Sequence, residues 1–162
     1  MGFPECGVKM PSKTFTVLSK LLSRQSMRPV TRFFTKAHVF LYKLTGGKAQ
    51  IPGYPTMLLT VKGRKTGKLR TIPLIYIKDS DRFVIAAAYA GSEHNPTWWL
   101  NLQSSGEGLV QVMRDTVRVS AQVAPPEARA DLWQRLSAMY PSFTDYQTRT
   151  SREIPIVILS PI

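Results

Sequence analysis

Apolar positions recur at helical spacing in the first third of the chain. From Pro29 onward they predict one long helix that Gly46-Gly47 would end; its stripe is Val30, Phe33, Phe34, Ala37, Phe40, Leu41 and Leu44. A shorter pattern of the same kind precedes it at Phe15, Leu18, Leu21 and Leu22. Lysines and arginines flank both stripes. Residues 1–50 are therefore predicted to form an N-terminal arm and amphipathic helical segments.

Such a basic amphipathic region has two interpretations. Most amphipathic helices of soluble domains bury their apolar stripe, so we expect the aromatic residues to pack on the core and the lysines to face water. The alternative is a peripheral contact with a membrane surface through residues 13–45.

From residue 51 the period changes to that of β-strands. Segments 56–63 and 69–79 flank a glycine-containing turn and predict a hairpin, and a strand over 83–89 follows. A second hairpin is predicted from 108–113 and 117–124, and a last strand over 154–159. Pro96 would start a short helix, and Pro126 a longer one that Pro141 would stop.

The predicted fold class is mostly β with helices (α+β). About six strands joined mainly by tight turns favour antiparallel pairing in a closed or partly closed barrel over residues 51–162, within one structural domain overall. A parallel Rossmann sheet is disfavoured because the long crossovers that it requires are missing, and the chain has no GxGxxG or P-loop motif.

Charge adds a prediction about partners. The chain carries 22 Lys and Arg against 10 Asp and Glu, a net charge of +12 that predicts an anionic partner. The stretch "TVKGRKTGKLRTIPL" places five cations in nine residues, from Lys62 to Arg70, around two glycines. Glycines permit tight turning and close approach to a ligand, so this turn could cradle a phosphate; an ordinary solvated hairpin explains the charge equally well.

The composition argues against several kinds of site and against a membrane-spanning or secreted protein. Cys6 is the only cysteine, and His38 and His94 lie far apart, so we expect no disulfide framework and no metal site. No apolar run is long enough to cross a bilayer and no secretory pattern opens the chain, so a cytoplasmic protein is expected. Paired catalytic carboxylates and a nucleophile elbow are also missing, which favours an enzyme that takes its chemistry from a cofactor.

Four ordered blocks carry a family resemblance: "LLTVKGRKTGKLRTIPL", "VIAAAYAG", "NPTWWLNLQ" and "MYPSFTDYQTRTSREIPIVIL". In order and spacing they resemble the deazaflavin-dependent nitroreductase family, actinobacterial oxidoreductases that use coenzyme F420. The resemblance covers about residues 51–162. It implies a six-stranded, FMN-binding-like split β-barrel and a long polyanionic cofactor with a flat ring at one end.

The resemblance also implies a binding site for that cofactor. The residues that would hold the phosphate and the poly-glutamate tail are Arg64, Lys65, Thr66 and Arg70. Those that would line the deazaflavin ring are Pro73, Leu74, Ala86, Ala87 and Ala88. A segment from Trp98 to Asn101 would close over the cofactor. Adjacent helical positions differ by about 100°, so only one of Trp98 and Trp99 should face the pocket, and the family position is Trp98.

The aromatic run "YPSFTDY" would form the substrate-binding wall through Tyr140, Phe143 and Tyr146, together with Ala88. Considered alone, such a stripe is more often core. Tyr140 and Tyr146 are the candidate catalytic residues, because their hydroxyls could donate a proton or orient the acceptor. At Phe143 and Ala88 the nitroimidazole-reducing pattern has tyrosine and often serine, so both differences remove a hydroxyl.

The resemblance therefore implies an F420-dependent reductase that transfers a hydride to an electron-poor small molecule: an enone, a quinone, an unsaturated lactone or a nitro compound. The lost hydroxyls favour the more apolar of these acceptors. The alternatives are an FMN- or haem-binding split barrel and a small basic barrel that binds nucleic acid. No nucleic acid is expected, because the cations cluster in the turn and the N-terminal region, the aromatic residues are spread over the helices and the barrel, and the chain has no recognisable RNA-binding motif.

Overall fold

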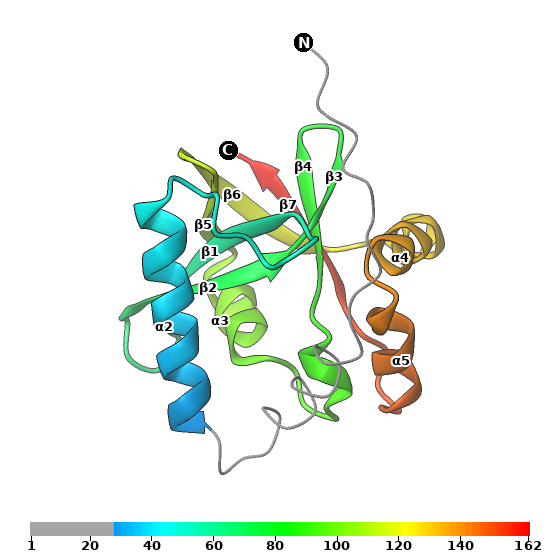
Figure 1. Cartoon of the computed structure of the whole chain (residues 1–162). Helices are drawn as coiled ribbons and strands as arrows, with labels where there is room; N and C mark the ends of the chain where they lie inside the picture. Colours follow the sequence, from blue (N-terminus) through cyan, green and yellow to red (C-terminus); the bar gives the residue numbers. More distant parts are fainter. Residues whose placement is uncertain (1–27) are drawn as a thin grey trace.

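The computed structural model describes residues 28–162 (Figure 1). The shorter helical pattern predicted at 15–22, and with it part of the proposed membrane-contact region, lies outside the described residues. The elements are α2 (Arg28–Leu44), β1 (Thr56–Lys62), β2 (Leu69–Ile75), β3 (Ile77–Asp79), β4 (Arg82–Ala86), the 3-10 turn η2 (Tyr89–Gly91), α3 (Thr97–Ser105), β5 (Glu107–Val112), β6 (Asp115–Val123), α4 (Pro126–Met139), α5 (Ser142–Thr148) and β7 (Ile156–Pro161). No helix in this part of the chain is long and apolar enough to cross a membrane.

The strands form one curled antiparallel sheet in the order β2-β1-β5-β6-β7-β4-β3. The predicted number of six strands is wrong for this sheet, which contains seven. The segment expected to be one strand over 69–79 is interrupted at Tyr76: β2 pairs with β1, whereas β3 pairs with β4. The interruption lets the chain change partner, so the two edge strands are consecutive in sequence and the sheet curls toward closure.

Both faces of the sheet are buried, and β7 shows this most clearly. Ile156 and Ile158 belong to one hydrophobic cluster, while Val157 and Leu159 belong to the other. The first cluster packs beneath α4 and α5, and the second beneath α3. In Figure 1, α4 and α5 lie to the right of the sheet and α3 lies below it. A strand covered on both faces reads as a continuous apolar run, as "IPIVIL" does.

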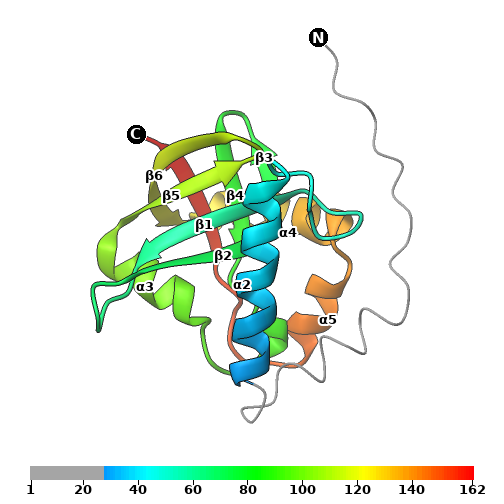
Figure 2. The same cartoon turned by 60° about the vertical axis from the view of Figure 1, so that its left-hand side comes forward.

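The long helix α2 crosses the outside of β1 and β2 (Figure 2). Tyr42 anchors it: the ring is fully buried, and its hydroxyl donates to the Thr56 carbonyl at 2.9 Å and accepts from the Met113 N–H at 3.0 Å. The expectation that its aromatic stripe packs on the core is wrong. Phe33, Phe40 and Leu44 are 69%, 65% and 70% exposed, because Tyr42 lies on the opposite side of the helix.

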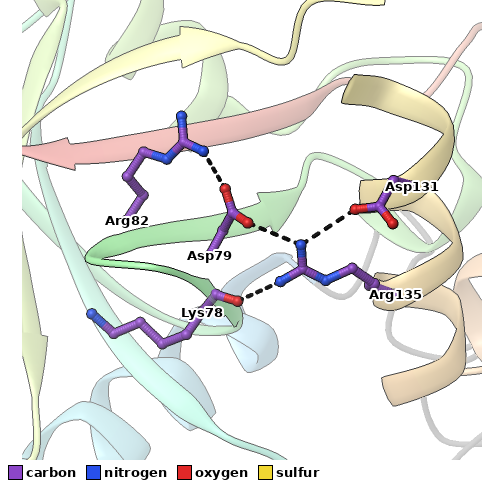
Figure 3. Close-up of polar contacts among 5 residues, drawn as sticks. All are labelled: Lys78, Asp79, Arg82, Asp131 and Arg135. Carbon is purple, nitrogen blue, oxygen red and sulfur yellow. Dashed lines mark hydrogen bonds and ion pairs between the residues drawn. The ribbon is translucent and has the colours of Figure 1, made fainter. Parts of the chain in front are cut away.

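A polar network joins α4 to the β3–β4 hairpin (Figure 3). Arg135 donates to an Asp79 carboxylate oxygen at 2.9 Å and to the Lys78 carbonyl at 2.7 Å, and it also contacts Asp131. Arg82 pairs with the second Asp79 oxygen. The hydrogen bond from Arg135, followed by the contacts with Arg82, holds the pKa of Asp79 below its usual range. Asp79 therefore links α4 to the β3–β4 hairpin, and both of its carboxylate oxygens are paired with arginines.

We expect Asp79→Asn to lower the free energy of unfolding by about 1–2 kcal/mol at pH 7, since it removes the charge from a partly buried network. The folded-state pKa is depressed, so this contribution is present above the unfolded pKa of about 3.9 and is lost as pH falls through the folded value. Urea unfolding at pH 7 measures the loss of unfolding free energy, and urea unfolding near pH 3 measures how much of the difference from wild type has disappeared. The control is Asp131→Asn at an exposed position, expected to cost under about 0.5 kcal/mol. Equal losses from the two variants would contradict the central role of Asp79.

Candidate functional site

A cavity with a volume of about 510 Å³ opens between β2, the β4–α3 connection, α3 and α5. It brings together ten of the residues predicted from the sequence: Arg70, Pro73, Leu74, Ala86, Ala88, Trp98, Asn101, Tyr140, Phe143 and Tyr146. They come from four separate stretches of the chain. The same cavity is also lined by residues that the sequence did not single out: Ile51, Val61, Ile72, Ile75, Tyr89, Ala90, Pro96 and Thr97.

The basic turn between β1 and β2 lies at one end of this cavity. A hydrogen bond of 2.9 Å from the Gly63 N–H to the Lys68 carbonyl closes the turn. Within it, Gly67 has a left-handed φ of 68°. Arg64, Lys65 and Thr66 are exposed and do not line the cavity. A hydrogen bond of 3.2 Å from the Arg64 N–H to the carboxamide oxygen of Asn101 holds the turn against α3. Asn101 and Arg70 both line the cavity, so the basic turn lies next to it.

The two tryptophans of α3 have different surroundings. Trp98 lines the cavity, whereas Trp99 is buried in the cluster beneath α3. The alanine segment after β4 divides in the same way. The side chains of Ala86 and Ala88 line the cavity, while Ala87 is fully buried in the opposite cluster. Only the backbone of Ala87 could therefore belong to the site.

Three aromatic rings form the wall at the α5 side. The ring of Tyr140 lies 5.0 Å from that of Phe143 and 6.2 Å from that of Tyr146. Tyr140 follows α4 and precedes α5, so a single helix does not carry all three rings. The hydroxyls of Tyr140 and Tyr146 are 3.2 Å apart. Burial, with a smaller effect of the bond to Tyr146, raises the pKa of Tyr140, so this hydroxyl keeps its proton at neutral pH.

Apolar residues dominate the middle of the cavity. Pro73 and Leu74 contribute from β2, and Ile75 follows at the end of that strand. No histidine lines the cavity: His38 bonds the Ala49 carbonyl beside α2, and His94 is exposed. Among residues 28–162, no three His, Cys, Asp or Glu side chains are grouped so as to hold a metal ion. The site suits a flat apolar ring with an anionic extension.

Sequence reasoning missed the residue with the most polar contacts near the site. Arg152 precedes β7 and makes hydrogen bonds to the connection between β4 and α3. It lies within the block "TSREIPIVIL", but neither spacing nor periodicity distinguishes it from a solvated arginine. Its partners are mostly backbone carbonyls, and a side chain that bonds distant backbone leaves no pattern in a sequence.

Comparison with known proteins gives matches over most of the chain. The family described as F420H(2)-dependent quinone reductase matches residues 34–161. An F420H(2)-dependent quinone reductase of Mycobacterium tuberculosis (strain H37Rv) is 34% identical over 145 residues, which are 86% of this chain and 97% of that protein.

Two solved structures extend the comparison. An F420-H2 dependent reductase (FDR-A) has a TM-score of 0.61 and 29% identity, and the match covers 65% of this chain and 94% of that one. A structure described as a domain-swapped dimer has a TM-score of 0.63 and 26% identity, over 82% of this chain and 99% of that one. The family match, the identity and the coverage agree. The chain belongs to the F420H(2)-dependent quinone reductase family.

Proposed function

We propose that this chain is an oxidoreductase that uses reduced coenzyme F420 to reduce a quinone-type acceptor. One observation carries the proposal: the lining of a cavity of about 510 Å³ contains both Arg70, from the basic stretch between β1 and β2, and the three aromatic rings of Tyr140, Phe143 and Tyr146. The family and the relatives described above support the choice of cofactor and acceptor. The cavity residues fit a long anionic cofactor with a flat ring.

The proposed binding roles follow from charge and shape. Arg64, Lys65, Thr66 and Arg70 hold the phosphate and the acidic tail through charge-assisted hydrogen bonds. Asn101 keeps the turn beside the cavity through its bond to the Arg64 N–H. Residues that offer apolar surface to the ring are Pro73, Leu74, Ala86, Ala88 and Trp98. The protein thus contributes proximity, orientation and exclusion of water.

When bound, the reduced cofactor supplies a hydride, and reduction of a quinone also consumes a proton. Tyr140 and Tyr146 are the proposed catalytic residues, because their hydroxyls lie at the acceptor wall and 3.2 Å from each other. Burial raises the pKa of Tyr140, so this hydroxyl stays protonated and can orient the acceptor by donating a hydrogen bond to it. Phe143 and Ala88 offer no hydroxyl, so the wall favours a flat, apolar acceptor over a nitroimidazole.

Titration of the chain with oxidised F420 tests the cofactor assignment. We expect saturable binding, and we expect Lys65→Ala to weaken it at least about threefold, because an exposed charge-assisted contact contributes roughly 0.7 kcal/mol. Lys48→Ala is the matched control. The neighbouring Gly47 packs on Met113, which lies beside the start of β1, whereas the basic turn follows the other end of that strand. Equal effects would mean that the turn does not hold the cofactor. Tight binding of FMN or haem with none of F420 would overturn the assignment.

Oxidation of reduced F420 in the presence of menadione tests the reaction. We expect wild type to catalyse it, and Phe143→Tyr to change the ratio of kcat/KM between menadione and a nitroimidazole in favour of the nitroimidazole. The new hydroxyl can hydrogen-bond a polar acceptor in the cavity. The affinity for F420 should change less than about twofold, since the added hydroxyl removes no charge-assisted contact with the phosphate or the acidic tail. An unchanged ratio would show that the aromatic wall does not select the acceptor.

We also propose that α2 makes a peripheral contact with an anionic membrane surface. Phe33, Phe40 and Leu44 lie within about 40° on the helix wheel and are exposed, a pattern unusual for a surface that faces only water. Lys36 and Lys43 flank this face, which suits acidic headgroups. A membrane-dissolved quinone would then be close to the enzyme.

Flotation with lipid vesicles measures this contact. We expect more protein on vesicles that contain phosphatidylglycerol than on phosphatidylcholine alone, and less of it for Phe40→Ser. Val123→Ser, at an exposed apolar position of β6, should bind like wild type. If no variant binds and Phe40→Ser instead reduces the size of the protein in gel filtration, the face is a contact between two copies.

A further inference from the structure

Arg152 holds a segment that lies more than 55 residues before it in the chain. Its Nε donates to the Ser92 carbonyl at 2.8 Å, and its Nη1 donates to the Asn95 side-chain oxygen at 3.0 Å. Its Nη2 donates to the carbonyls of Ala87 and Ala88 at 3.0 and 2.9 Å. All three nitrogens of the guanidinium therefore bond the connection between β4 and α3. Lysine cannot reproduce this planar fork.

The segment that Arg152 holds forms part of the cavity wall. Ala88, Tyr89 and Ala90 all line the cavity. Tyr89 and Ala90 have left-handed φ values of 48° and 54°, which cost non-glycine residues about 1–2 kcal/mol each. Such a backbone persists only where its surroundings fix it. The carbonyl of Ala88, which immediately precedes these two residues, is one that Arg152 bonds.

Two further contacts fix the same segment. Glu93 accepts hydrogen bonds from the backbone N–H and the hydroxyl of Ser151, both at 3.0 Å, next to Arg152 in sequence. Gly91 packs closely on α5: a Cβ there would lie 2.6 Å from the Tyr146 carbonyl oxygen. The segment therefore contacts the residues that precede β7 through Glu93, and it contacts α5, the helix that carries Phe143 and Tyr146, through Gly91.

We propose that Arg152 is a positioning residue that sets the cavity wall at Ala88–Ala90 and thereby aligns the acceptor with the cofactor ring. The proposal rests on the function proposed above. Without the hydrogen bonds of the Arg152 guanidinium, Tyr89 and Ala90 relax from their left-handed conformations, and the cavity wall that they form moves. Arg152 makes none of these hydrogen bonds with Arg70, Asn101 or the basic turn, so the contacts proposed for the cofactor's acidic tail remain without it and cofactor binding depends on it less than acceptor alignment does.

Hydrogen exchange of the protein without cofactor tests the positioning directly, whatever reaction the chain performs. We expect Arg152→Lys to speed amide exchange in residues 87–95 at least about tenfold, because the variant loses most of the bonds that restrain this segment. Exchange in β1 should not change. Arg129→Lys is the matched control: Arg129 bonds the Ile154 carbonyl and pairs with Glu153, so it holds the neighbouring residues but not the cavity wall. Unchanged exchange in 87–95, or an equal rise with Arg129→Lys, would overturn the proposal.

Kinetics then separate positioning from simple loss of stability. With reduced F420 and menadione, we expect Arg152→Lys to lower kcat/KM at least about tenfold, since a small misplacement of reacting groups is costly. The Kd for F420 should rise less than about threefold, and Arg129→Lys should leave both values near wild type. If Arg152→Lys lowers only the unfolding midpoint, Arg152 is structural and the proposal fails. If wild type oxidises no reduced F420, the proposed function fails, while the exchange result stands on its own.

Discussion

The structure depends on burying both faces of one curled sheet. The alternation in β7, where Ile156 and Ile158 face one cluster and Val157 and Leu159 the other, requires cover on each side. α4 and α5 provide it on one face and α3 on the other. The cavity forms where these two covers meet the edge strand β2, and this explains why its lining comes from segments far apart in sequence. The site is a consequence of how the sheet closes.

The side-chain hydrogen bonds between these elements fall into two groups, one that stabilises the fold and one that shapes the cavity. Asp79 and Arg135 fasten α4 to the β3–β4 hairpin away from the cavity, so they stabilise the fold. Asn101 and Arg152 act at the cavity itself: one holds the cationic turn and the other the alanine segment. The rest of the lining is mostly apolar, apart from Arg70 and the hydroxyls of Tyr140 and Tyr146. Such a division suits an enzyme that orients a cofactor and an acceptor and supplies little chemistry itself.

Much of the fold could be predicted because its signals are local. Glycine and proline marked the turns and helix starts, and the apolar period changed where the strands begin. The break at Tyr76 could not be predicted, because a strand that changes partner keeps its alternation. Nor could the exposure of Phe33 and Phe40: the stripe was visible, but only the packing of Tyr42 shows which side of α2 faces the sheet. For the cavity, the family resemblance grouped residues that spacing alone could not group. The hydrogen bonds of Arg152 and the left-handed backbone of Tyr89 could not be predicted, because both result from tertiary contacts.

We propose that one cavity holds both the cofactor ring and the acceptor, and that the basic turn holds the tail. A crystal structure of the chain with oxidised F420 and menadione measures this most directly. The account predicts ring density between Leu74 and the aromatic wall at Phe143, phosphate density within hydrogen-bonding distance of Arg64 or Lys65, and menadione against Tyr140. Cofactor density outside this cavity, or in it with the tail pointing away from the turn, would contradict the account.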